Sequence, residues 1–309
     1  MTVPIWFDDL PVLGKLPPAQ AAAKLREVGE NKIADTLEAA KDTRDFQTFG
    51  ALSRILSFQN RQWQHTAHAF GYLTPSLPGS EPLTIRHAGN IEADPTLRNS
   101  RIKISLDRLR VADYPGGGTH RILFDFYAQN QVSSGIEHLH FNATYRVREN
   151  EEAAIMGYPI FVGLNVGIEG VVFRCLTVNV KNEDDEALLG FLESDVFKSG
   201  LMLATTAQPA IAPLSSMAIA LTKSIARRHK NVPVQEFYIG LDFTKMPFRA
   251  RLNEGSYIAV QIPEAFERVW DWDEWVYHPK SGQVVSRDDE AKLIPYNYLV
   301  FSVSRYVGD

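Results

Sequence analysis

The chain has 309 residues, of which 45% are hydrophobic and 22% charged, a mixture typical of a folded protein rather than a disordered one. Its net charge of −5 provides no general attraction for a phosphate backbone, so nucleic acid is not an expected partner. A single cysteine, Cys175, excludes an intrachain disulfide, and no apolar run reaches the roughly eighteen residues of a membrane span. The segment 1–11 lacks a basic start and contains Asp8 and Asp9, so it does not resemble a secretory signal, and we expect a cytoplasmic protein.

Three helices are predicted before residue 74. Pro17 and Pro18 suit the first turn of a helix over 19–28, which Gly29 ends, and a short helix follows over 31–40. The third, over 45–72, rests on apolar residues three and four positions apart: Phe49, Leu52, Leu56, Trp63, Ala67 and Phe70. The stretch 74–82, rich in proline and glycine, is predicted to be a linker, because the apolar period changes there from about 3.6 to 2.

Alternating apolar residues predict strands after the linker, over 102–111, 122–126, 139–147, 159–166, 171–180, 234–243, 257–262 and 298–306. In the first of these the apolar parity changes between Leu106 and Leu109, which predicts a one-residue β-bulge near Asp107. Two helices are predicted within 182–230, the first capped by Asn182 and followed by an acidic turn. The predicted fold class is α+β, with an N-terminal α-helical region (1–73), a linker (74–82) and an antiparallel β-sandwich domain (83–309) that carries the two-helix insertion.

The stretch from Arg101 to Asp113, the loop Pro115 to Gly118 and the strand from Arg121 to Phe126 resemble the opening strands of C2 domains. The similarity covers 101–126 only, and Thr119-His120-Arg121-Ile122 stands where that family usually has a Ser-Asp-Pro-Tyr-like tetrad. The resemblance implies a β-sandwich that docks on lipid or protein.

His138 and His140 are the candidate metal ligands, because residues two apart on a strand project from the same face. Asn142, Thr144 and Arg146 share that face, and the apolar residues occupy the other. A solvent-facing polar ladder is therefore predicted, since two histidines alone leave a zinc shell incomplete.

The familiar local signatures of catalysis and of nucleotide binding are missing from the sequence, so no catalytic residue and no cofactor is predicted. His65 and His68, three apart on the third predicted helix, are expected to face solvent. Cys175 lies in an apolar strand, and we expect it to be a core residue.

The segment 270–277 holds three of the five tryptophans and alternates them with acids. Aromatic platforms beside acceptors suit sugar rings, peptide side chains or cationic groups, so this segment is the predicted binding site: Trp270, Asp271, Trp272, Asp273, Glu274, Trp275 and Tyr277. The alternative is that the rings fill the core. If the segment is a regular strand, its parity groups Trp275 with Asp271 and Asp273, which makes Trp275 the exposed ring.

The leading functional prediction is a non-enzymatic binding or scaffold protein that acts through protein–protein contacts of the sandwich and the N-terminal helices, with a protein partner or with itself. One alternative is a carboxylate-based hydrolase or carbohydrate-active enzyme that uses Asp271, Asp273 and Glu274. Another, which follows from the C2 resemblance, is a peripheral membrane-docking module.

Overall fold

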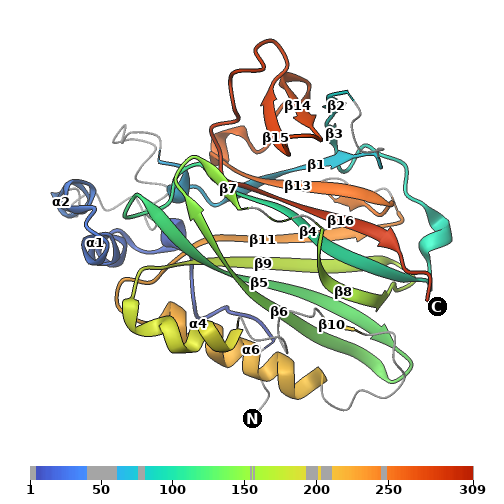
Figure 1. The fold of residues 1–309 in the computed structure, drawn as a ribbon, viewed down its shortest axis with the longest axis horizontal. Coiled ribbons are helices and arrows are strands. Elements are labelled where there is room, and N and C mark those ends of the chain that lie inside the picture. The colour runs from blue at the N-terminus through green and yellow to red at the C-terminus, as the bar shows by residue number, and fades with distance from the viewer. Residues whose placement is uncertain are drawn as a thin grey trace.

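The computed structural model describes residues 5–39, 61–75, 81–153, 155, 157–192, 201–202, 211–244 and 249–308. Within them most of the regular structure is antiparallel strand, and the longer helices lie near the N-terminus and in one insertion, which confirms the α+β class (Figure 1). No helix in these ranges is both long enough and apolar enough to cross a membrane.

The first sheet has eight strands in the order β10-β8-β4-β16-β13-β1-β3, with β7 beside β4. Its strands are β1 (Ala67–Leu73), β3 (Arg86–His87), β4 (Arg101–Val111), β7 (Glu151–Ala153), β8 (Tyr158–Asn165), β10 (Leu201–Met202), β13 (Gly255–Ile262) and β16 (Tyr298–Arg305). The second sheet has five strands in the order β12-β11-β9-β5-β6. They are β5 (Thr119–Val132), β6 (Gly135–Arg148), β9 (Gly170–Val180), β11 (Val232–Asp242) and β12 (Ala250–Arg251).

These two sheets share one apolar core. Phe301 of the first sheet lies 5.5 Å from Phe126 and 5.8 Å from Phe173 of the second, measured between ring centroids. Cys175 is buried in the same core, which confirms its predicted place. Helices α1 (Pro18–Glu27) and α2 (Asn31–Ala39) join this core through Leu25 and Leu37.

A third sheet covers the outer side of the first. It contains β2 (Leu83–Thr84), β14 (Trp275–His278) and β15 (Gln283–Ser286), at the top of Figure 1. A second apolar cluster, in which Trp272 and Val284 pack against Ile258 and Val300, joins it to the first sheet. Short 3-10 helices occupy several connections: Leu13–Lys15, Gln62–Gln64, Pro95–Leu97, Glu183–Asp185, Glu264–Phe266 and Trp272–Glu274.

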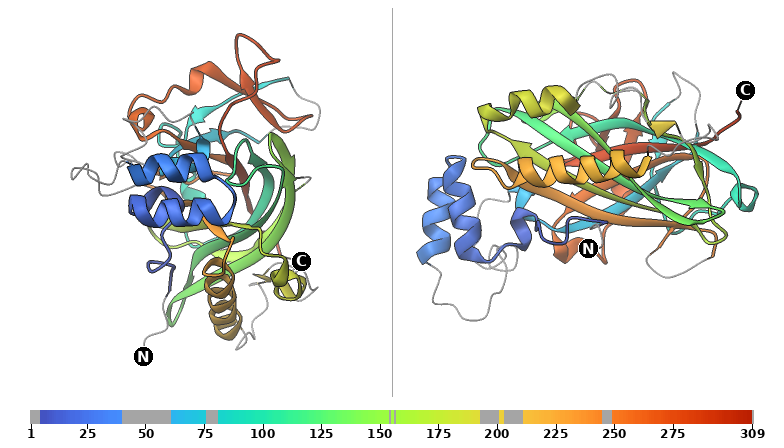
Figure 2. Two further views of the ribbon diagram at one scale, coloured as in Figure 1. Left: turned by 90° about the vertical axis from the view of Figure 1, so that its left-hand side faces the viewer. Right: turned by 90° about the horizontal axis from the view of Figure 1, so that it is seen from below.

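Helices α4 (Glu186–Leu192) and α6 (Ile211–Ala226) lie across the outer side of the second sheet, as the right-hand view of Figure 2 shows. Leu189 and Ile225 pack there against Leu176 of β9. The side chain of Asn182 accepts a hydrogen bond from the Asp184 amide at 2.9 Å, so the predicted cap and helical insertion are confirmed.

All eight predicted strands are present, and the bulge in β4 is confirmed. Val300 of β16 lies opposite Arg108 and Phe301 opposite Leu106, so the register passes over Asp107. Leu106 and Leu109 are fully buried in the core. Asp107 and Arg108 consequently both project toward the third sheet.

The predicted helix over 45–72 is wrong in its described part, because Ala67–Leu73 forms β1 and pairs with β13 along its whole length. Residues 45–60 lie outside the described ranges. The expectation that His65 and His68 face solvent is also wrong, since His65 is buried beside Glu264 and the ring of His68 packs against Phe70 and Phe237. The division into 1–73, 74–82 and 83–309 stays a prediction.

Candidate functional site

The face of β6 that carries His140 does not face water, so the predicted solvent-facing ladder is wrong there. His140 and Asn142 are buried beneath α6 and the N-terminal segment. His140 Nδ1 lies 2.9 Å from Oδ1 of Asp125, and its Nε2 lies 3.2 Å from the carbonyl oxygen of Ile5. The Asn142 amide donates to Asp125 Oδ2 at 2.8 Å and to Thr222 Oγ1 at 2.9 Å.

The partners of His140 determine how many protons the buried pair holds. A carbonyl oxygen only accepts, so Nε2 must carry a hydrogen, and the contact with Asp125 needs a second one on the ring or on the carboxyl. The pair is therefore neutral as a whole, and both ring nitrogens are engaged. Among the described residues no group of three His, Cys, Asp or Glu side chains could hold a metal ion.

The predicted aromatic site is not a regular strand. Trp272–Glu274 forms a 3-10 turn, which Asp271 caps by accepting a hydrogen bond from the Asp273 amide at 2.8 Å. The turn changes the direction of the side chains that follow, so Trp272 and Trp275 are only 4% and 8% exposed. The expectation that Trp275 is the exposed ring is wrong.

The other residues of the segment 270–277 differ in their exposure and surroundings. Trp270 is half-buried and stacks on Trp275 with 6.3 Å between ring centroids. Asp271, Asp273 and Glu274 are exposed, and Tyr277 lines a pocket together with residues far away in the sequence. Ligand binding by the segment 270–277 stays a prediction. Tyr277 is the residue of this segment that lines one of the two pockets.

Two pockets stand out among the described residues. The larger, of about 510 Å³, lies at one end of the second sheet, and the smaller, of about 410 Å³, lies between the first sheet and β14. The smaller one contains a carboxyl group, that of Asp107, whose pKa is strongly shifted. A perturbed titratable group in a cavity indicates a functional site, so we treat this cavity, the Asp107 pocket, as the candidate site.

Neighbouring strands place the polar groups of the Asp107 pocket. The β4 bulge turns Asp107 toward Ser302 of β16 and Ser256 of β13. The Ser302 hydroxyl lies 3.3 Å from Oδ1 of Asp107, and the Ser256 hydroxyl lies 3.4 Å from Oδ2. Bulges often redirect a side chain at functional sites in this way. Tyr277 of β14 forms part of the opposite wall.

Burial raises the pKa of the Asp107 carboxyl to about 6. The hydroxyls of Ser302 and Ser256 and the charges of Arg108 and Lys103 act in the opposite direction, but they do not outweigh the loss of solvation. Asp107 therefore changes its charge close to neutral pH.

Two charged neighbours of Asp107, Arg108 and Glu254, are engaged in other contacts. Arg108 donates to the carbonyl oxygen of Ile155 and packs over Gly282, where a β-carbon would lie 1.8 Å from the guanidinium Nε. Glu254 accepts a hydrogen bond from the Arg305 amide at 2.8 Å. Within the described ranges, no basic side chain approaches the Asp107 carboxyl to 4 Å.

Among the described residues, no histidine or lysine lines the pocket, and the titratable group next to the hydroxyls of Ser256 and Ser302 is the Asp107 carboxyl, which accepts a hydrogen bond from each. A largely buried carboxylate with no described basic side chain within 4 Å favours a cation. Sequence reasoning did not select Asp107, Ser256 or Ser302 as site residues, although the predicted bulge was the signal for Asp107.

No family model matches the chain, and neither does any curated protein or any solved structure. The C2 resemblance over 101–126 stays a prediction.

Proposed function

We propose that this protein is a non-enzymatic binding protein whose Asp107 pocket receives a lysine or arginine side chain of a partner protein. The observation that carries the proposal is the Asp107 carboxyl. It faces a cavity of about 410 Å³ and is largely buried, and within the described part of the chain its hydrogen-bond partners are two serine hydroxyls, at 3.3 and 3.4 Å. A cation in the pocket would compensate a charge that burial otherwise destabilises.

The walls of the pocket suit the rest of such a side chain. Leu73 and Leu83, which pack in the apolar cluster on the outer side of the first sheet, provide apolar surface for the methylene stem of a lysine. Tyr277 adds an aromatic ring, whose negative face attracts cations. Methylenes and a terminal positive charge are therefore both accommodated, which favours a lysine or arginine side chain over an inorganic cation.

In this proposal the two large sheets are the layers of a β-sandwich that acts as a rigid scaffold. Three strands of one sheet, β4, β13 and β16, hold the carboxyl and the two hydroxyls, and preorganised groups bind with less loss of entropy. The buried thiol of Cys175 fits a reducing compartment, so we propose that the partner is met in the cytoplasm.

The hydrolase alternative has weaker support. Asp271, Asp273 and Glu274 are exposed, and none of them lines either pocket. Hydrolysis of a glycosidic bond by two carboxylates needs a facing pair about 5–9.5 Å apart around the substrate.

Peptide selection tests the proposal. A random peptide library is selected on the immobilised full-length protein, and the best peptide is resynthesised with each lysine replaced by norleucine, which keeps the stem and removes the charge. We expect one such replacement to weaken binding by about tenfold or more, as loss of a desolvated charge contact does. Asp107→Asn should have the same effect, whereas Asp288→Asn, at an exposed aspartate outside the pocket, should have none. Equal affinity of the wild type and Asp107→Asn for every selected peptide would contradict the proposal.

A further inference from the structure

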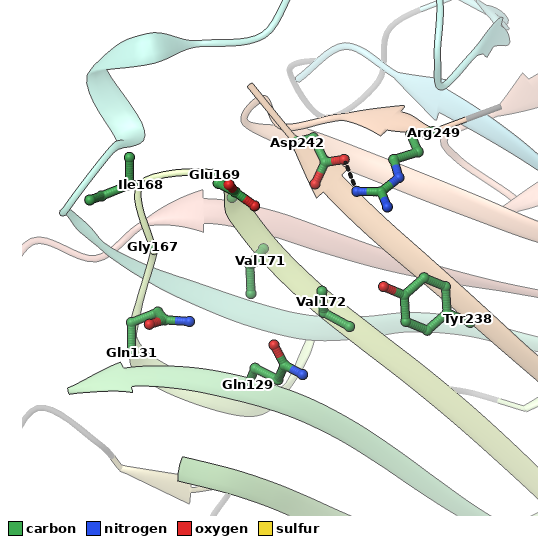
Figure 3. A pocket seen from close by; sticks show the side chains of 11 residues that line it. Gln129, Gln131, Gly167, Ile168, Glu169, Val171, Val172, Tyr238, Asp242 and Arg249 are labelled. Carbon is green, nitrogen blue, oxygen red and sulfur yellow. Dashed lines mark hydrogen bonds and ion pairs between the residues drawn. The ribbon is translucent and has the colours of Figure 1, made fainter. Parts of the chain in front are cut away.

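The larger pocket lies where β5 and β11 end and β9 begins in the second sheet, and we call it the Tyr238 pocket (Figure 3). Gln129 and Gln131 enter it from β5, and Tyr238 and Asp242 enter it from β11. The turn 167–170 closes one side, held by a hydrogen bond of 3.1 Å from the Gly167 amide to the Gly170 carbonyl oxygen. The pocket shares no residue with the Asp107 pocket.

Tyr238 offers an accessible aromatic ring at this pocket. The residue is 51% exposed although it lies in the middle of β11, and Figure 3 shows its hydroxyl directed toward the cavity. The Arg174 guanidinium lies 5.5 Å from the centre of the Tyr238 ring and 5.3 Å from that of Trp6. The ring is therefore supported by its neighbours, and a large exposed aromatic surface of this kind is typical of recognition sites.

Asp242 and Arg249 form the polar side of the pocket. Arg249 Nη1 donates to Asp242 Oδ2 at 2.9 Å, and the Arg249 side chain is 50% exposed, whereas that of Asp242 is 9% exposed. This bond uses one carboxylate oxygen of Asp242 and one guanidinium nitrogen of Arg249, so the second oxygen and the other N–H groups are not occupied by it. In such a pair the carboxylate can accept a hydrogen bond from one hydroxyl, and the guanidinium can donate a hydrogen bond to the next hydroxyl.

The other polar groups of the pocket can also both donate and accept hydrogen bonds. The side-chain amides of Gln129 and Gln131, two apart on one face of β5, each contain a donor and an acceptor, as does the Tyr238 hydroxyl. Among the described residues that line the pocket, the one basic group, Arg249, is paired with Asp242, and the carboxylates of Glu169 and Asp242 disfavour anions. A ligand that fits is uncharged, has a flat apolar face and carries several adjacent hydroxyls.

We propose that the Tyr238 pocket binds a neutral saccharide, with a sugar ring against Tyr238 and two adjacent hydroxyls bridging Asp242 and Arg249. A peptide main chain also offers a donor and an acceptor to the Asp242–Arg249 pair, but it lacks the flat C–H face that a sugar ring presents to Tyr238. The site is independent of the proposed Asp107 function, so Asp107→Asn should leave saccharide binding unchanged. Each proposal can fail without the other.

Saturation-transfer NMR of the full-length protein with a panel of neutral oligosaccharides of glucose, galactose, mannose and N-acetylglucosamine tests the inference. We expect at least one of these oligosaccharides to bind. Tyr238→Ala should weaken its binding by about tenfold or more, and Tyr238→Phe should weaken it by less than about threefold. Arg249→Gln should weaken it while the melting temperature stays within a few degrees, because the side chain is half-exposed.

The matched control is Tyr306→Ala, a tyrosine outside the pocket, which should bind like the wild type. Absence of binding by every member of the panel would overturn the inference. So would binding that Tyr238→Ala leaves unchanged, or a pocket that takes only peptides or only charged sugars.

Discussion

The Ser302 hydroxyl lies 3.3 Å from Oδ1 of Asp107. Ser302 belongs to β16, which pairs with β4 both before and after the bulge that contains Asp107. A regular strand would alternate Asp107 and Arg108 between the two faces of the sheet, whereas the bulge leaves both on the face that meets the third sheet. A carboxyl group is thereby held in a site where its ionisation costs free energy. Sites that bind ligands commonly retain such a cost in the free protein.

We expect Asp107→Asn to stabilise the protein at neutral pH. Burial raises the folded-state pKa to about 6, above the ordinary 3.8, so the ionised carboxylate destabilises the fold fully above about pH 6, and this cost disappears as the pH falls toward 4. The free energy of unfolding should rise by about 1–2 kcal/mol near pH 7.5, below the roughly 3 kcal/mol of the full shift because water reaches the pocket.

Urea unfolding near pH 7.5 and near pH 4 measures this difference. Asp288→Asn, at an exposed position, is the control and should change stability by less than about 0.5 kcal/mol at both pH values. A destabilised Asp107→Asn near pH 7.5 is the outcome that contradicts the prediction.

His140→Ala should be strongly destabilising. Removing the imidazole leaves the fully buried Asp125 without its neutralising partner, and breaking a buried pair in this way costs about 3–5 kcal/mol. His138→Ala is the matched control. Among the described residues the half-buried ring of His138 hydrogen-bonds to the Tyr127 hydroxyl alone, so its loss should cost about 1 kcal/mol.

Denaturant unfolding of these variants and of the double variant Asp125→Ala with His140→Ala tests the coupling. The double variant should cost less than the sum of the two single changes, because Asp125→Ala removes the buried carboxyl group that His140→Ala leaves without its imidazole partner. Additive costs would mean that the 2.9 Å contact does not couple the two residues.

Trp270 should be the tryptophan that iodide quenches most. It is the one half-buried ring, whereas the other four are between 0% and 8% exposed: Trp6, Trp63, Trp272 and Trp275. Trp270→Phe should remove most of the quenchable fluorescence, and Trp275→Phe should remove little. Trp272→Ala should instead destabilise by about 3–5 kcal/mol, because the indole packs in the core against Gly71. Quenching that persists in Trp270→Phe would refute this assignment.

Local periodicity predicted the strands, the helical insertion and the bulge well, because each depends on neighbours in sequence. The shift of parity between Leu106 and Leu109 was enough to place the bulge at Asp107. The helix over 45–72 failed in its described part because the segment 67–73 fits both periods. Ala67, Ala69 and Leu73 alternate as in a strand, and pairing with β13 selects the strand over the helix.

The burial of His140 and the position of Trp275 could not be read from local pattern. Alternation in β6 shows that one face is polar but not that α6, far along the chain, covers it. The 3-10 turn that Asp271 caps changes which side of the chain the Trp275 side chain faces, so counting alternate positions as in a strand places Trp275 on the wrong side. The Asp107 pocket likewise joins β4, β13, β14 and β16, and this proximity follows from sheet order rather than from any motif.

The pH dependence of peptide binding tests the proposed role of Asp107 most directly. Isothermal titration of a selected lysine peptide should show affinity that falls by about tenfold between about pH 7.5 and pH 5, because a pKa of about 6 leaves only about one-tenth of the carboxyl ionised at the lower pH. In Asp107→Asn the affinity should be low at both pH values and should lack this fall. The same pH profile in both proteins, or tighter binding by the wild type at the lower pH, would contradict the role assigned to Asp107.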